Sequence, residues 1–227
     1  MATPVAPIPE ASPEPERRIV ARLAAIRVLP VLTVTDVRTV EATCRALLDG
    51  GVSCVEITYR TACADEAIML ASQIPGLLVG AGTVTDAGQA AAAAQAGARF
   101  AVAPGLSEPV VAAAREIGLP FFPGVATPSE IGRAASLGCR VLKVFPASSL
   151  GGPAFLRSVS APYPGLRFIP TGGISASTLG QYLELPAVIA CGGSWLCDEA
   201  LVAAGRFHEI RRRAVATRAA ATRAAAP

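Results

Sequence analysis

The chain has 227 residues, of which 52% are hydrophobic and 16% are charged, and this composition indicates a globular protein with a substantial core. Its net charge of +3 does not predict a nucleic-acid partner, because residues 19–210 carry 13 basic and 14 acidic side chains and the basic excess lies near the C-terminus. The sequence has neither a membrane-length apolar run nor an apolar signal core, so we expect a cytoplasmic protein without membrane contact.

The two ends of the chain differ in composition from its middle. Residues 1–14 are rich in proline and alanine and are expected to form a disordered tail. Residues 216–227 are expected to form an Ala/Arg-rich C-terminal tail. The segment between them, residues 15–215, predicts a single domain that begins with a helix over residues 15–25.

Apolar segments of strand length alternate with helical segments through the domain. Asp36, Asp86 and Thr127 are of the type that begins helices, and they stand at the entries of helical segments. Nearly continuous apolar strands separated by helices favour parallel pairing, and a count of eight predicts an α/β fold, a compact (β/α)8 TIM barrel. An open doubly wound sheet is the alternative, but no G-x-G-x-x-G motif follows the first strand. The eight expected strands begin at Val28, Val52, Leu77, Ala98, Leu119, Cys139, Leu166 and Ala187.

Lys143 is the only lysine among 20 basic residues, and it lies in the sixth expected strand. Strand alternation allows Lys143 and Glu56, in the second expected strand, to project into the same interior. A buried salt bridge is the structural alternative, but arginine is the usual residue for that role and fills every other basic position. Burial disfavours the charged ammonium and leaves a neutral amine that attacks a carbonyl to form a Schiff base. A nearby carboxylate then moves protons at the adjacent carbon.

Glycine-rich turns follow the seventh and eighth expected strands. The segments Gly172–Gly173 and Gly192–Gly193–Ser194 leave backbone N–H groups free at helix entries, which is how barrels hold phosphate. Arg60 comes just after the strand of Glu56, and its guanidinium is suited to bind a carboxylate, although a surface arginine at the rim is the alternative. Thr83 follows a glycine-rich strand end and offers a hydroxyl to the same carboxylate.

The cysteines and the histidine indicate what chemistry not to expect. Six cysteines form no C-x-x-C pair and several lie within apolar segments, so they are interpreted as reduced core residues. The single histidine, His208, lies beyond the last expected strand. A histidine-rich metal site and a Ser-His-Asp triad are therefore not expected.

Several segments resemble, in order and spacing, the 2-keto-3-deoxy-6-phosphogluconate (KDPG) aldolases and the related 4-hydroxy-2-oxoglutarate (KHG) aldolases. They include GGVSCVEITYRT, FAVAPGLSEPVV, LKVFPAS, FIPTGGIS and GGSWL, and the resemblance covers roughly residues 15–210. It implies a homotrimeric class I aldolase, an aldehyde-lyase that needs neither metal nor organic cofactor. The implied reaction cleaves KDPG, a phosphorylated keto acid, to pyruvate and glyceraldehyde 3-phosphate in the Entner–Doudoroff pathway.

The resemblance also implies a role for each residue of the site. By motif, Lys143 forms the Schiff base and Glu56 acts as acid and base, while Arg60 and Thr83 hold the carboxylate of the pyruvyl group. The pocket is implied to be shaped by Pro104, Phe145 and Thr171, and the phosphate to be received by Gly172, Gly173, Gly193 and Ser194.

Other functions stay open at the level of sequence. Ser148 stands where several family members have an acidic residue and Thr33 where some have an arginine, and both departures concern substrate selectivity. The alternative substrates are 2-keto-3-deoxy-6-phosphogalactonate, the C4 epimer of KDPG, and 4-hydroxy-2-oxoglutarate. Two alternatives from other classes are a pyridoxal-phosphate-binding barrel and a non-catalytic oligomeric scaffold.

Overall fold

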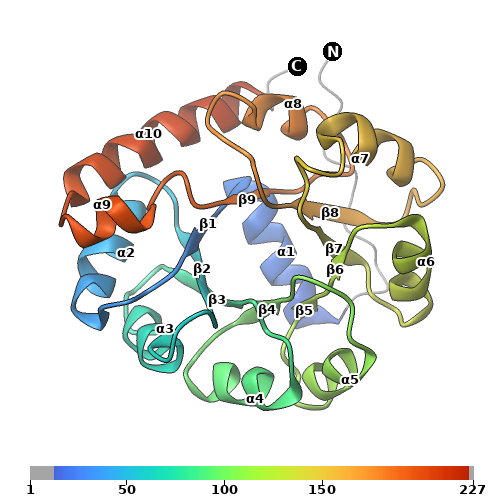
Figure 1. Cartoon of the computed structure of the whole chain (residues 1–227), viewed down its shortest axis with the longest axis horizontal. Helices are drawn as coiled ribbons and strands as arrows, with labels where there is room; N and C mark the ends of the chain where they lie inside the picture. The colour runs from blue at the N-terminus through green and yellow to red at the C-terminus, as the bar shows by residue number, and fades with distance from the viewer. Residues whose placement is uncertain (1–12, 225–227) are drawn as a thin grey trace.

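The computed structural model describes residues 13–224, in which parallel strands form a curled inner layer surrounded by helices (Figure 1). The tail expected over residues 1–14 lies, but for its last two residues, outside the described part. The strands are β1 (Val28–Leu32), β2 (Cys54–Thr58), β3 (Leu78–Gly82), β4 (Phe100–Val102), β5 (Phe121–Phe122), β6 (Gly124–Val125), β7 (Val141–Val144), β8 (Arg167–Pro170) and β9 (Cys191–Gly193).

The strands belong to two sheets, one in the order β5-β4-β3-β2-β1-β9 and one in the order β6-β7-β8, and all their pairings are parallel. β5 and β6 are separated only by Pro123, which has no N–H to donate to a ladder, so the fifth expected strand is divided into two short ones. Isolated parallel bridges join Phe168 to Val188 and Thr171 to Gly192, between the β8 and β9 segments. The expectation of eight uninterrupted strands in one barrel is thus met in part, as an α/β fold with curled parallel sheets.

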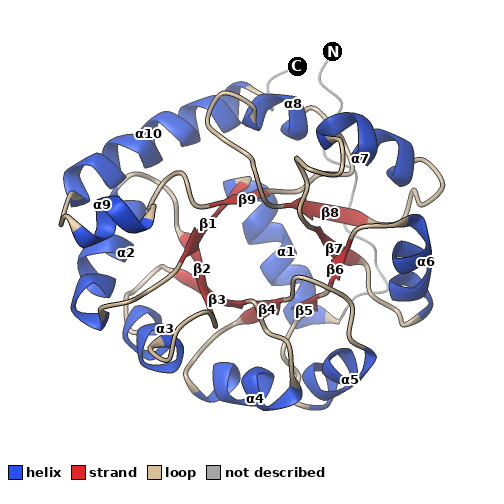
Figure 2. Ribbon diagram, in the orientation of Figure 1, coloured by secondary structure: helices blue, strands red, loops and turns tan. Residues whose placement is uncertain are grey.

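Apart from the leading helix, the helices follow the strands along the chain and lie outside them (Figure 2). The leading helix expected over residues 15–25 is present, and in this view it projects onto the middle of the ring of strands. The helices are α1 (Glu14–Ile26), α2 (Val40–Asp49), α3 (Ala64–Ser72), α4 (Ala87–Gln95), α5 (Glu108–Glu116), α6 (Pro128–Ser136), α7 (Gly152–Ser160), α8 (Leu179–Leu183), α9 (Glu199–Ala203) and α10 (Phe207–Arg223), with a 3-10 helix η1 (Val37–Thr39) before α2.

Core residues lie on both faces of the strands, including the face that packs against the surrounding helices. Every residue of the assigned strands is buried, which agrees with the apolar sequence of these segments. Five of the six cysteines are buried too, and burial raises the pKa of the Cys54 thiol to about 12. No helix within residues 13–224 combines the length and the apolar character that a membrane span requires.

The last helix continues into the Ala/Arg-rich C-terminal segment. α10 runs without interruption through residue 216 to Arg223, and its Thr217 and Ala221 are buried. α10 packs against α2, α8 and α9 (Figure 1). The described part of the Ala/Arg-rich segment is therefore a packed helix that belongs to the domain.

Candidate active site

Two charged side chains meet in the interior between the sheets. Lys143 lies in β7 and Glu56 in β2, and Nζ of Lys143 donates a hydrogen bond to Oε1 of Glu56 at 3.0 Å. The two side chains are only 5% and 1% exposed. An amine and a carboxylate, 87 residues apart in sequence, thus form a buried pair.

The second oxygen of Glu56 has no partner. Oε2 is buried and accepts no hydrogen bond from any residue between 13 and 224. An unpaired buried carboxylate oxygen costs free energy, so stability alone gives no reason to keep it. One oxygen of Glu56 holds the amine while the other is available to take a proton from a bound molecule.

Glycine in β3 leaves room for this pair. Gly82 pairs with Thr58 of β2, and a Cβ at position 82 would overlap the Glu56 carboxylate. The next residue, Thr83, has φ +59°, in the left-handed region that β-branched residues rarely occupy. Backbone strain of this kind is held by the surrounding structure and is common at functional sites.

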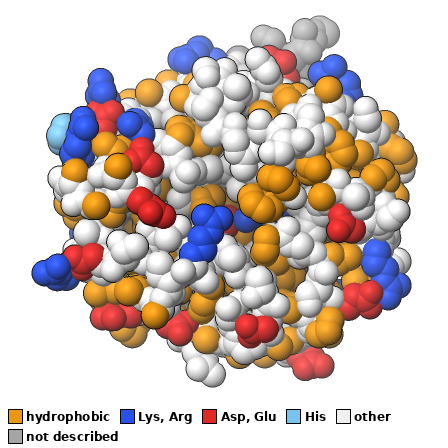
Figure 3. Space-filling view, in the orientation of Figure 1, with side chains coloured by type: hydrophobic (Ala, Val, Ile, Leu, Met, Phe, Trp, Pro, Cys, Tyr) orange, Lys and Arg blue, Asp and Glu red, His pale blue; other side chains and the backbone are white. Residues whose placement is uncertain are grey.

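A cavity of about 510 Å3 lies beside the pair and is lined by residues at the carboxyl ends of five strands. Phe145 connects the two features, since it lines the cavity and its ring centroid lies 5.7 Å from Nζ of Lys143. In the space-filling view, basic side chains lie near the middle of the face that Figure 1 presents (Figure 3). The site residues expected from sequence that line the cavity are Arg60, Phe145, Thr171, Gly172, Gly173, Gly193 and Ser194.

Thr83 and Pro104 do not line this cavity but lie close to the buried pair. Thr83 directly follows the Gly82 that contacts Glu56. The backbone of Pro104 lies so close to Gly124 that a Cβ at position 124 would overlap it, and Gly124 is the register partner of Lys143. All the residues expected at the site are therefore placed around one region, with the pair buried at its base and the cavity beside it.

The glycines after β8 shape one wall of the cavity. Gly172 and Gly173 have φ values of +98° and +72°, which a residue with a side chain adopts only with strain. A Cβ at Gly172 would lie 3.2 Å from the ring of Phe145. The loop thus approaches the cavity with its backbone, as phosphate-binding turns do.

Several residues of the cavity were not expected from sequence. Thr33 was noted only as a departure from the family; its hydroxyl hydrogen bonds with that of Thr58 at 3.0 Å. Trp195 lies in the motif GGSWL, and Asp198 is the N-cap of α9. These residues follow β1 and β9. A position just after the carboxyl end of a strand is therefore the sequence signal that could have identified them. The others are Val31, Ile174, Cys197 and Glu199.

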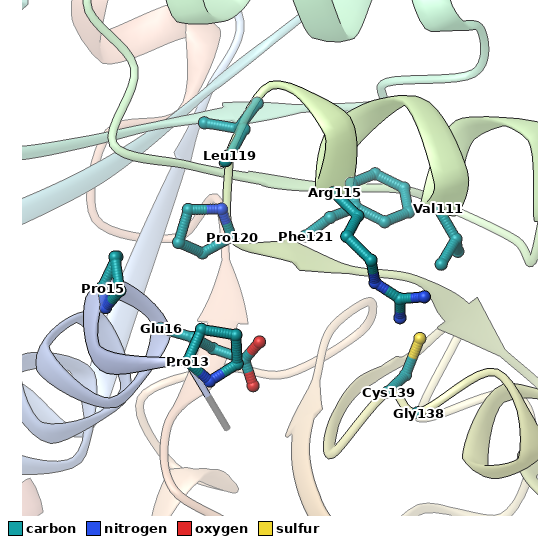
Figure 4. Close-up of a pocket in the computed structure, with 11 residues that line it drawn as sticks. Pro13, Pro15, Glu16, Val111, Arg115, Leu119, Pro120, Phe121, Gly138 and Cys139 are labelled. Carbon is teal, nitrogen blue, oxygen red and sulfur yellow. The ribbon is translucent and has the colours of Figure 1, made fainter. Parts of the chain in front are cut away.

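A second, smaller cavity of about 210 Å3 lies between the start of α1 and the segment leading into β5 (Figure 4). Pro15, Val111, Leu119 and Phe121 give it mainly apolar walls. Arg115 borders it and donates a hydrogen bond to the carbonyl of Leu137 at 2.7 Å. None of the site residues expected from sequence lines this cavity, so the cavity at the carboxyl ends of the strands is the candidate active site.

Known proteins resemble this chain over most of its length. The family model described as KDPG and KHG aldolase matches residues 19–213. The 2-dehydro-3-deoxy-phosphogluconate aldolase of Treponema pallidum is 43% identical over 189 residues, which are 83% of this chain and 90% of that protein.

Solved structures give the same result. The KDPG aldolase of Legionella pneumophila, with pyruvate captured as a covalent carbinolamine, superposes with a TM-score of 0.84 at 34% identity over 90% of this chain and 98% of that one. The 2-keto-3-deoxy-6-phosphogluconate aldolase of Zymomonas mobilis with 3-phosphoglycerate gives 0.82 at 35% identity, over 89% and 96%.

Proposed function

The chain belongs to the KDPG and KHG aldolase family, and on that premise we propose that it is a class I aldolase that cleaves KDPG to pyruvate and glyceraldehyde 3-phosphate. The observation that carries this proposal is the buried contact of 3.0 Å between Nζ of Lys143 and Oε1 of Glu56. Lysine alone among the basic residues supplies a primary amine, and this chain has one lysine.

The first steps join the substrate to Lys143. The amine of Lys143 attacks the C2 ketone of KDPG, and the carbinolamine that forms loses its hydroxyl as water to give a cationic imine. Glu56 moves the protons of these steps, because it already contacts the amine and has a second oxygen without a partner.

Cleavage follows from the charge of the imine. Glu56, directly or through a water molecule, removes the proton of the C4 hydroxyl, and the electrons of the C3–C4 bond move toward the imine. Glyceraldehyde 3-phosphate leaves, and the enamine of pyruvate takes a proton at C3. Water then hydrolyses the imine, which releases pyruvate and restores Lys143.

The other residues hold the two ends of the substrate. Arg60 and Thr83 are proposed to bind the carboxylate next to C2, at the end of the substrate nearer the buried pair. Phosphate is proposed to lie at the far wall of the cavity, on the loops that follow β8 and β9. Orientation by both ends places C2 against the amine and contributes much of the rate. Pro104, Phe145 and Thr171 shape the pocket, and Gly172, Gly173, Gly193 and Ser194 receive the phosphate.

We propose, too, that the two sheets close into an eight-stranded barrel. The continuity of β5 and β6 through Pro123 supports this at one junction, and the bridges between the β8 and β9 segments support it at the other. A homotrimer is the assembly that the family resemblance favours, and light scattering tests it. The cytoplasmic location expected from the sequence stays a proposal.

The decisive experiment is borohydride reduction in the presence of pyruvate, followed by intact-mass measurement and peptide mapping. We expect one reduced pyruvyl group per chain on Lys143 and none on Lys143→Arg, which keeps the charge but not the chemistry. Lys143→Arg that still cleaves KDPG at the wild-type rate would overturn the proposal. Visible absorbance before any keto acid is added, bleached by borohydride, would instead indicate bound pyridoxal phosphate.

Substrate choice is a separate measurement. The family name includes KHG, and the cavity wall has Thr33 where some members have arginine. Because the glycine loops after β8 and β9 are proposed to bind phosphate, we expect kcat/KM to be highest for KDPG, lower for its C4 epimer and lowest for unphosphorylated KHG. The reverse order would make the unphosphorylated acid the better candidate substrate.

A further inference from the structure

Side chains on one face of α10 form hydrogen bonds with the loop at the end of β9, residues 193–198. Nη1 of Arg213 donates hydrogen bonds to the carbonyl oxygen of Trp195 at 2.6 Å and to Oδ2 of Asp198 at 2.9 Å. One turn further along the helix, the hydroxyl of Thr217 accepts a hydrogen bond from Nε1 of Trp195 at 3.4 Å. The loop is thus held at a carbonyl, at a carboxylate and at an indole ring.

Trp195 links these hydrogen bonds to the part of the loop that lines the cavity. Its ring packs against Gly193 so closely that a Cβ at position 193 would overlap it. The loop is tied to itself as well, because the N–H of Cys197 donates to the carbonyl of Ser194 at 3.1 Å. A fixed Trp195 therefore fixes the backbone of Gly193 and Ser194, two of the four residues proposed to receive the phosphate.

Arg213 also acts on the charge of the cavity. Asp198 and Glu199 line the wall where phosphate is proposed to bind, and like charges repel. Arg213 pairs with Asp198, whose other oxygen accepts the N–H of Leu201 at the start of α9. The guanidinium offsets the negative charge of that carboxylate while it holds it in place.

The helix that supplies these contacts is itself anchored. Arg218 donates to the carbonyl oxygen of Ala25, at the end of α1, at 3.2 Å, and also to that of Ile26. Glu209, one turn before Arg213, accepts from Nε of Arg213 at 3.2 Å. Arg213 and Thr217 thus extend from a helix that other contacts hold in place. Within residues 13–224, neither of them is among the residues that line the cavity.

We propose that Arg213, assisted by Thr217, is a positioning residue that sets the affinity for the phosphate group of the substrate through Trp195 and Asp198. This inference rests on the proposed aldolase function and its phosphate subsite. It assigns a role to the face of α10 that carries Arg213 and Thr217, which composition did not indicate. The chemistry at Lys143 does not depend on Arg213, so binding of phosphate and reaction with pyruvate respond differently to its loss.

The test compares Arg213→Met with Arg212→Met, a matched control. Arg212 lies beside Arg213 and binds Glu209 through two bonds of 2.8 Å, but the structure gives it no contact with the loop. We expect Arg213→Met to raise KM for KDPG about tenfold to hundredfold, since it loses hydrogen bonds to a charged group. KM for unphosphorylated KHG and the rate of borohydride trapping with pyruvate should change less than about threefold. Arg212→Met should resemble the wild type in all three measurements.

Two further variants guard against a failure of Arg213→Met to fold. Arg213→Lys keeps the charge near Asp198 and is expected to recover part of the affinity for KDPG. Thr217→Val removes the partner of the Trp195 indole and is expected to raise KM for KDPG with unchanged pyruvate trapping. Calorimetric binding of 3-phosphoglycerate should weaken in Arg213→Met and Thr217→Val in step with KM.

Three outcomes overturn the inference: an equal loss for KDPG and KHG, an equal effect of Arg212→Met, or binding of 3-phosphoglycerate that is unchanged in Arg213→Met. Failure of the proposed function gives another result, because the wild type would then neither trap pyruvate nor cleave KDPG.

Discussion

At the level of single residues, the two oxygens of Glu56 have different surroundings, and this difference predicts the effect of one substitution. Glu56→Gln keeps the shape and leaves an oxygen for Lys143, but an amide cannot take up a proton as a carboxylate does. We expect exchange of the C3 protons of pyruvate with deuterated water to slow by about 10²–10⁴. Proton NMR of the pyruvate methyl group measures this exchange, and exchange at the wild-type rate would exclude Glu56 as the base.

Gly82 lies against the Glu56 carboxylate, and this close approach predicts the effect of a second substitution. An alanine there would push its Cβ into the Glu56 carboxylate, so we expect Gly82→Ala to displace Glu56 from Lys143 and to lower kcat/KM at least about tenfold. Overpacking should lower the free energy of unfolding by about 1–3 kcal/mol. Gly180→Ala is the control, since a Cβ at Gly180 in α8 meets no atom within 4 Å. Equal activities of the two variants would show that Glu56 tolerates the methyl group.

Among the elements, α6 begins with the strongest local signal in the described chain. Thr127 accepts the N–H of Glu130 at 3.2 Å, and the Glu130 carboxylate accepts the N–H of Thr127 at 2.9 Å, a complete capping box. Thr127→Ala should lower the free energy of unfolding in urea by about 1 kcal/mol and leave kcat unchanged. Ser107, the N-cap of α5, makes no capping hydrogen bond through its side chain, so Ser107→Ala should cost less. A larger loss for Ser107→Ala would contradict this explanation.

Some helices and strands can be predicted from the sequence, and others cannot. Helix starts at Asp36, Asp86 and Thr127 are predictable because a cap is a contact between neighbours in sequence. Pairing across sheets is not local, so the interruption at Pro123 and the short β9 depend on partners that no segment reveals by itself. The length of α10 follows from packing of Thr217 and its neighbours, which composition does not report.

Some residues of the candidate site can likewise be predicted from the sequence, and others cannot. Strand alternation is a fixed geometric rule, so it allows Lys143 and Glu56 to project into the same interior without knowledge of the fold in detail, and both are buried. Thr33 and Asp198 reach the cavity through the conformations of loops, and those conformations depend on tertiary contacts such as that of Arg213 with Asp198. Sequence therefore predicts the reactive pair better than the walls that select the substrate.

For the molecule as a whole, charge is distributed unevenly. The interior holds one amine and one carboxylate in contact, while the other ion pairs in the described residues are formed by arginine at the surface or partly buried. Exposed pairs contribute little stability individually. Glu209 on α10 differs from the exposed pairs, because it is buried and binds two arginines, Arg212 and Arg213.

Glu209 links the stability of the whole chain to pH. Hydrogen bonds from Arg212, followed by those from Arg213, lower the pKa of the Glu209 carboxyl from 4.5 to about 2. Between pH 4.5 and pH 2 the unfolded chain therefore binds more protons at this position than the folded chain, and stability falls as the pH falls. The stabilisation is complete above pH 4.5 and lost as the pH approaches 2.

Glu209→Gln isolates this contribution from those of other carboxyls with lowered pKa, such as Glu14, Asp36 and Glu108. Urea unfolding of both proteins across this range should give a difference in free energy that is constant above pH 4.5 and shrinks steadily below it. A difference that does not change with pH would mean that the carboxylate is not held ionised by the two arginines. Because Arg213 also binds the loop after β9, the KM of the wild type for KDPG is expected to rise over the same range, beyond the rise seen in Glu209→Gln.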